Sequence, residues 1–177
     1  MLRHIIKIFF FIALLASFLF SVAAYAAGSE GDWSFTYDCS KATGFYKERC
    51  EEGIRDSFRL YSVTRQGDRI CASSLASWQL GNHVDECDGV CVCGTVKKNT
   101  AVVSFDSTWM DTPGKAKITY NPHTDTLTWT LITPPKGGGD SGYDTAWWFP
   151  DHAVLKRDHR SKRHTSRPLD CAKCAAE

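Results

Sequence analysis

Three cysteines and three carboxylates lie within ten residues near the middle of the chain, and side chains of these types at this spacing can do chemistry. The residues are Asp85, Glu86, Cys87, Asp88, Cys91 and Cys93. Such a cluster suits a metal site, a redox site or a set of disulfides. The compartment in which the protein folds decides which of the three it is.

The first 26 residues have the pattern of a secretory signal peptide. Basic residues precede an apolar run over residues 8–22, and Ala-Tyr-Ala at 24–26 fits the cleavage pattern. The run is shorter than the roughly 20 residues of a membrane-spanning helix. We therefore expect cleavage after residue 26, a periplasmic or secreted location, and no stable membrane insertion afterwards.

All eight cysteines follow this segment: Cys39, Cys50, Cys71, Cys87, Cys91, Cys93, Cys171 and Cys174. An even number of cysteines in an oxidising compartment favours disulfides. With His83, the central cluster offers four zinc ligands, but its Cys-x-Cys spacing and single histidine differ from those of structural zinc sites. We therefore predict disulfides, with no metal and no cofactor.

The pattern before residue 67 predicts a helix pinned by a disulfide. Between residues 40 and 65 the apolar side chains recur every three or four positions, as on one face of a helix. They are Tyr46, Cys50, Ile54, Phe58 and Tyr61. Cys39 and Cys50 are placed to tie the first turns of this helix to the segment before it.

After residue 68 apolar and polar residues alternate, which is typical of half-buried antiparallel strands. The predicted strands are residues 70–80, 90–97, 101–105, 116–120, 127–131 and 145–157. Turn-forming residues at 121–125 predict a hairpin between two of them. Cys91 and Cys93 lie on one such strand with their partners left open, Cys71 and Cys87 among the candidates.

The charge is divided between an acidic body and a basic tail. Residues 27–155 carry 12 basic and 17 acidic side chains, whereas residues 156–177 carry seven and three. The tail has almost nothing apolar to bury, so we predict that it is disordered, with a local Cys171–Cys174 disulfide as the default. A basic run of this kind could bind nucleic acid or anionic lipid, but an exported chain favours a solvated terminus, so we expect no nucleic-acid partner.

These patterns give an α+β fold in four segments. Residues 1–26 form the signal peptide, 27–67 the helical segment, 68–157 an antiparallel β-meander or small barrel, and 158–177 the basic disordered tail.

Catalytic residues are not expected. Gly-Asp-Ser-Gly at 139–142 looks like the nucleophile loop of trypsin-like serine proteases. No histidine has the sequence context of that family's base, and a serine without a positioned base is not a nucleophile. We therefore interpret this stretch as a glycine-rich loop.

The first segment after the signal resembles a known family. Asp-Cys-Ser-Lys-Ala-Thr at 38–43, followed by Glu-Arg-Cys at 48–50, is similar to the opening of LprI-type lysozyme inhibitors. The β-meander is also similar to the small barrel of the membrane-bound and periplasmic C-type lysozyme inhibitors. Those inhibitors present a small-residue loop to the enzyme, and residues 137–143 form the loop most like it here.

The resemblance implies a non-catalytic protein that binds a protein partner, with a basic cell-wall hydrolase as the candidate. An acidic body would be steered electrostatically to a basic enzyme. The candidate partner-binding residues are Asp85, Glu86, Asp88, Lys136, Asp140, Ser141 and Tyr143. An immunity protein, a small glycan-acting enzyme and an envelope structural protein remain alternatives.

Overall fold

The computed structural model of the protein describes residues 28–137, 149–159 and 168–174. The strands are β1 Gly31–Thr36, β2 Ser57–Gln66, β3 Arg69–Trp78, β4 His83–Lys97, β5 Thr100–Phe105, β6 Gly114–Asn121, β7 Thr126–Thr133 and β8 His152–Arg157. The helical elements are η1 Cys39–Lys41, α2 Gly44–Glu51 and η2 Cys171–Lys173. Within these ranges, no helix has the length and apolar character needed to cross a membrane.

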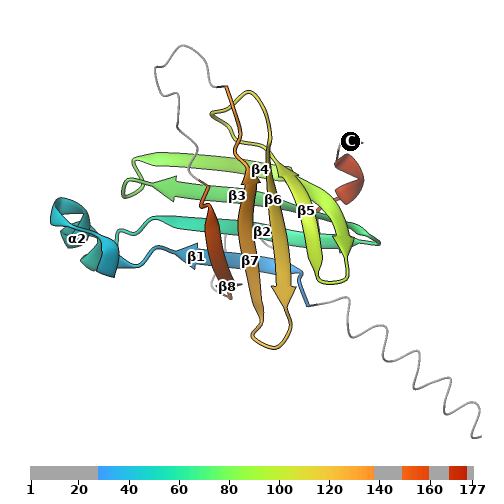
Figure 1. Cartoon of the computed structure of the whole chain (residues 1–177), viewed down its shortest axis with the longest axis horizontal. Coiled ribbons are helices and arrows are strands. Elements are labelled where there is room, and N and C mark those ends of the chain that lie inside the picture. The colour runs from blue at the N-terminus through green and yellow to red at the C-terminus, as the bar shows by residue number, and fades with distance from the viewer. Residues whose placement is uncertain (1–27, 138–148, 160–167, 175–177) are drawn as a thin grey trace, which may run out of the picture.

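The strands form a closed antiparallel barrel in sequence order. Each strand pairs with the next, and β1 pairs with β8 through Trp33 opposite Arg157. Figure 1 shows β6 and β7 crossing β2 and β3, with α2 on the left and the red η2 segment on the right. Closure gives every strand a neighbour on both sides, although β4 pairs with β5 only from Val92 to Lys97 and β1 pairs with β8 only at Trp33 and Ser34.

The predicted α+β class with a leading helix is wrong. The chain enters the barrel through β1, and the predicted helix over residues 40–65 shrinks to η1 and the eight-residue α2. Its second half is β2, in which Phe58 and Leu60 point into the core. Apolar residues at 54, 58 and 61 fit a helix, but alternation at 58 and 60 fits a strand, and pairing with β1 and β3 decides between them.

Aromatic side chains fill the barrel. Trp129 packs against Phe58, Phe105 and Phe149 with ring centres 4.9, 5.1 and 6.1 Å away. Its indole N–H donates a hydrogen bond of 2.9 Å to the carbonyl of Pro150. Eight-stranded barrels are filled by side chains or hold one small ligand, and this barrel is of the filled kind.

Four disulfides join Cys39 to Cys50, Cys71 to Cys171, Cys87 to Cys91 and Cys93 to Cys174. The predicted Cys39–Cys50 pair is confirmed. The default Cys171–Cys174 pair is wrong, because both cysteines reach strands of the barrel. The cysteines of the central cluster are all oxidised, so none is a thiolate metal ligand. Four disulfides indicate an oxidising, non-cytoplasmic location.

Residues 168–174 of the predicted disordered tail lie on the outer face of the barrel. The amide of Leu169 donates to Thr64 Oγ1 at 2.9 Å, and the amide of Cys171 donates to Gln66 Oε1 at 3.0 Å. Cys71 lies between two residues of the core, so its side chain points outward, and it is buried because this segment covers it. Disulfides hold the segment in place although its composition is polar. The preceding residues 160–167 lie outside the described part.

Candidate functional site

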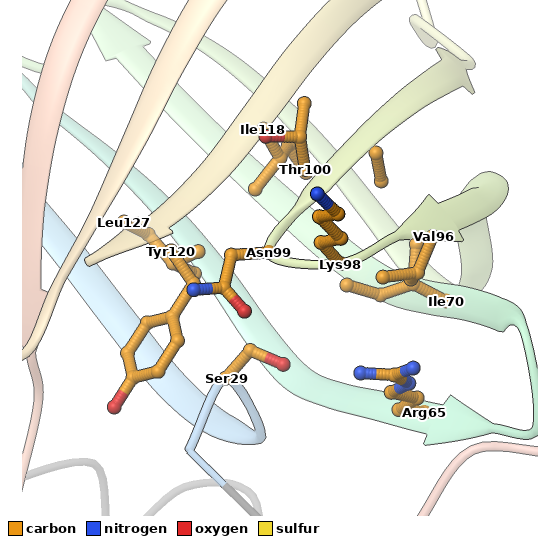
Figure 2. A pocket seen from close by; sticks show the side chains of 11 residues that line it. Ser29, Arg65, Ile70, Val96, Lys98, Asn99, Thr100, Ile118, Tyr120 and Leu127 are labelled. Atoms are coloured by element: carbon orange, nitrogen blue, oxygen red, sulfur yellow. The ribbon is translucent and has the colours of Figure 1, made fainter. Parts of the chain in front are cut away.

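A small hollow lies among the described residues at the end of the barrel that carries Arg157 and the β2–β3, β4–β5 and β6–β7 turns. Its volume is about 20 Å³, which is room for a water molecule rather than a ligand. Figure 2 shows the side chains around it, with Ser29, Arg65 and Asn99 supplying polar groups. The interior of the described barrel is therefore not the candidate site.

A larger hollow, which we call the α2 groove, lies at the opposite end of the barrel. It has a volume of about 440 Å³ and lies between the η1–α2 segment and the turn that joins β3 to β4. Its aromatic and charged lining consists of Tyr37, Asp38, Lys41, Tyr46, Asp56 and Trp78. A volume in this range is typical of binding sites.

The inner wall of the groove continues the aromatic core beyond the end of the barrel. Alternate residues of a strand share a face. Tyr37 therefore lies on the same inward face as Trp33 and Phe35, and Trp78 lies on the same inward face as the fully buried Ala76. The rings of Tyr37 and Trp78 meet edge to face with centres 5.4 Å apart. Trp78 is 40% exposed and presents part of its ring to the groove.

The outer wall of the groove is held by the Cys39–Cys50 disulfide. Asp38 caps η1 by accepting hydrogen bonds from the amide and the hydroxyl of Ser40 at 3.0 and 2.5 Å. These bonds lower the pKa of Asp38. Tyr46 projects from the first turn of α2 and is 48% exposed. The buried residue of α2 is Cys50, in its last turn. The disulfide thus fixes an aromatic side chain that α2 alone would leave loosely placed.

Asp56 holds the β3–β4 turn. Its carboxylate accepts a hydrogen bond of 2.8 Å from the amide of Leu80. Leu80 is one of two non-glycine residues in this turn with positive φ, which is 53° at Gln79 and 61° at Leu80. Non-glycine residues rarely adopt this conformation, so the carboxylate stabilises a strained turn. Burial raises the pKa of Asp56.

The same wall carries negative charge. Burial raises the pKa of Tyr37 to about 12, with further contributions from the charges of Asp56 and Asp151. Both carboxylates therefore act on the phenol at the inner wall. The α2 groove combines exposed aromatic faces with two carboxylates, Asp38 and Asp56, and one ammonium group, that of Lys41.

Asp85, a predicted partner-binding residue, has a structural role instead. Its side chain is fully buried because it lies opposite Ala76 and shares that residue's inward face. It accepts hydrogen bonds from Ser107 Oγ at 2.5 Å and from the amide and hydroxyl of Thr108, both at 2.9 Å. Asp85 anchors the 106–113 loop and is not accessible to a partner.

The other predicted partner-binding residues lie away from the α2 groove or outside the described residues. Glu86 and Asp88 are exposed on β4. Lys136 is also exposed, and its backbone carbonyl accepts a hydrogen bond of 2.9 Å from the amide of Thr112. The 106–113 loop thus contacts both Asp85 and Lys136. The remaining three, Asp140, Ser141 and Tyr143, lie outside the described residues.

The sequence-based prediction missed the residues of the groove. Tyr46 was assigned to the face of the predicted helix, and Trp78 to the interior of a strand. A large aromatic residue at the end of a strand, three positions before the turn glycine Gly81, was the one local signal. No such signal marked Tyr37, because the strand before it, β1, was not predicted.

Comparison of the chain with protein-family models, with curated proteins and with solved structures gives no match.

Proposed function

We propose that the protein is an exported, non-catalytic binding protein and that the α2 groove is the face that receives a protein partner. The observation that carries this proposal is the set of three aromatic side chains, Tyr37, Tyr46 and Trp78, around one open groove. Tyrosine and tryptophan in such positions supply most of the binding energy at protein interfaces.

The groove is also held rigid before binding. The Cys39–Cys50 disulfide fixes its outer wall, and the Asp56 carboxylate fixes the turn that follows Trp78. A preorganised site loses less conformational entropy when a partner binds. Rigid walls of this kind suit an inhibitor, which must hold its shape against the partner's surface.

For the partner we propose a basic cell-wall hydrolase, and for the location the periplasm or the exterior of the cell. The net charge of residues 27–155 is −5, which would attract a basic enzyme over long range. The similarity of residues 38–50 to LprI-type lysozyme inhibitors supports the same class of partner.

A bacterial lysis assay tests this proposal. Oxidised protein starting at residue 27 is titrated against C-type, G-type and I-type lysozymes, with peptidoglycan plus the protein alone as a control. We expect inhibition of one type at near-stoichiometric concentration. Lysis by the protein alone would instead favour the glycan-acting enzyme, and no effect on any lysozyme would reject the hydrolase partner.

Two tryptophan variants locate the binding face. Trp78→Ala should weaken inhibition at least tenfold, as loss of an aromatic anchor does. Trp109→Ala is the matched control, because Trp109 is 56% exposed and does not line the groove. Equal effects of the two substitutions would place the interface elsewhere.

A further inference from the structure

We propose that the α2 groove receives a cationic side chain, an arginine or a lysine, from the partner protein. This inference rests on the proposed binding function and names the chemistry that the groove recognises.

The aromatic rings provide the first half of a cation site. Trp78 and Tyr46 line the groove from β3 and α2 and are 40% and 48% exposed, and Tyr37, also in the lining, packs edge to face against Trp78. A cation placed over the face of such rings is attracted by their π electrons, most strongly where water is partly excluded. A guanidinium group also stacks flat on aromatic rings.

The Asp56 carboxylate in the lining provides the second half. The ion pairs among the described residues are Lys47–Glu51, Arg49–Glu52 and Arg157–Asp125. Asp56 belongs to none of these pairs, and its charge acts on Tyr37, as does the charge of Asp151, which does not line the groove. Burial desolvates Asp56, and backbone amides that include Leu80 already donate to it. The carboxylate has no cationic partner among these ion pairs, so an incoming cation would supply its counter-ion.

The rim has a different balance of charge. Asp38 lies in the field of Lys41 and Arg55, so its charge is already opposed by two cations. Lys41 lines the groove and is exposed. It should repel a cationic ligand weakly, because exposed charges are screened by solvent. The attraction therefore comes from the inner wall, and removal of the Lys41 charge should strengthen binding.

Small probes test the inference without the partner. N-acetylarginine amide is titrated into the oxidised protein and followed by amide and indole NMR shifts. The neutral isostere N-acetylcitrulline amide is the matched probe, and methyl N-acetylglucosaminide tests a sugar. We expect the arginine probe to shift the Trp78 indole and the Leu80 amide, and to bind about 3- to 30-fold more tightly than citrulline.

Three variants separate the groove charges. Asp56→Asn keeps an oxygen that can accept from the Leu80 amide, and it should reduce the preference for arginine over citrulline at least threefold. Lys41→Gln should raise arginine affinity. Glu86→Gln is the control, since this exposed carboxylate does not line the groove. Unchanged amide spectra elsewhere in Asp56→Asn confirm that the barrel is intact.

The outcomes distinguish this inference from the proposed function. Equal binding of arginine and citrulline, or a response to the sugar alone, would overturn the cation site. Lysozyme inhibition that persists in full in Asp56→Asn would keep the binding function and reject the cation site. Arginine binding without inhibition of any lysozyme would keep the cation site and reject the hydrolase as partner.

Discussion

The guanidinium carbon of Arg157 lies 4.3 Å from the ring centre of Trp33, so a charged group covers the end of the aromatic core. The same guanidinium donates to both carboxylate oxygens of Asp125 at 2.8 and 2.7 Å. It also donates to the carbonyls of Gly28 and Glu30, each at 2.6 Å. One side chain therefore joins β8, the β6–β7 turn and the residues before β1 where the barrel closes.

The Arg157–Asp125 pair should make stability depend on pH in the acid range. The hydrogen bonds from Arg157 lower the pKa of Asp125, so its contribution is present above the unfolded carboxyl pKa of about 3.9 and is lost as pH falls through the folded pKa. Asp125→Asn should lower the free energy of unfolding at pH 7 by at most about 1 kcal/mol, because the pair is partly exposed.

Urea unfolding at pH 7 and in acid measures this effect. The gap between the wild type and Asp125→Asn should narrow as the pH falls below 4. Asp68→Asn, an exposed carboxylate of the β2–β3 turn, should show no gap at either pH. An Asp125→Asn gap that stays constant into strong acid would contradict the assigned pair.

Asp85 should be far more sensitive to substitution than its neighbour. Asp85→Ala leaves the buried hydroxyl of Ser107 and the donors of Thr108 without their acceptor, at a cost of about 2–4 kcal/mol. Glu86→Ala removes an exposed side chain and should change stability by less than about 0.5 kcal/mol. Thermal unfolding of both variants gives the comparison, and similar melting temperatures would refute the anchoring role of Asp85.

The two disulfides that reach the C-terminal segment, Cys71–Cys171 and Cys93–Cys174, should stabilise the protein more than the local Cys87–Cys91 disulfide does. While one long-range bond remains, the loop closed by the other runs from Cys71 to Cys93, across the remaining bond, and from Cys174 to Cys171; these separations are 22 and three positions. Loss of either long-range bond alone therefore opens a loop of about 25 residues and lowers the free energy of unfolding by about 3.5 kcal/mol. Loss of both costs more than twice that, since the second bond then closes the full loop, with a separation of 100 for Cys71–Cys171.

Cys87–Cys91 is the internal comparison for these bonds. Its sequence separation is four, and a loop of that size predicts a loss of only about 2 kcal/mol. Paired cysteine-to-alanine variants are compared by urea unfolding at 25 °C. A larger loss for Cys87–Cys91 than for Cys71–Cys171 would contradict the loop-entropy explanation.

Tyr37 should remain protonated at high pH. Its pKa is raised to about 12, so the folded state favours the neutral phenol, and the resulting stability is present below pH 10 and is lost as the pH rises towards 12. Absorbance titration at 295 nm should show a late-titrating tyrosine that is missing in Tyr37→Phe, whereas Tyr120, whose pKa burial also raises, is unchanged by the substitution. Tyr61→Phe is the comparison, and a late-titrating amplitude that is as large in Tyr37→Phe as in the wild type would overturn the assignment.

The local sequence patterns were sufficient to predict the strands in the middle of the chain. Alternation over residues 101–131 predicted β5, β6 and β7 to within two residues at each end. In β2 the same kind of information was ambiguous, because the spacing of Phe58 and Tyr61 fits a helical face. Contacts with β1 and β3 settle its conformation, and such contacts have no signal within a short window.

The site was harder to predict for the same reason. Tyr37 directly follows β1 and Trp78 ends β3, and the two meet only because β2 lies between those strands and pairs with both. The sequence indicated that Asp85 belongs to an acidic surface loop. In the structure Asp85 lies opposite Ala76 on β3, so its side chain points into the barrel. Cys171 and Cys174 looked like a local pair, although their partners lie 100 and 81 positions away.

The C-terminal disulfides also impose an order on biosynthesis. Cys71 and Cys93 emerge from the ribosome early, but their partners follow β8, and β1 must likewise wait for β8 before the barrel closes. During that interval the nascent chain exposes reactive thiols beside Cys87 and Cys91, which can form non-native bonds. Thiol–disulfide exchange corrects such bonds, so the yield of native protein should depend on a disulfide isomerase in the compartment where the chain folds.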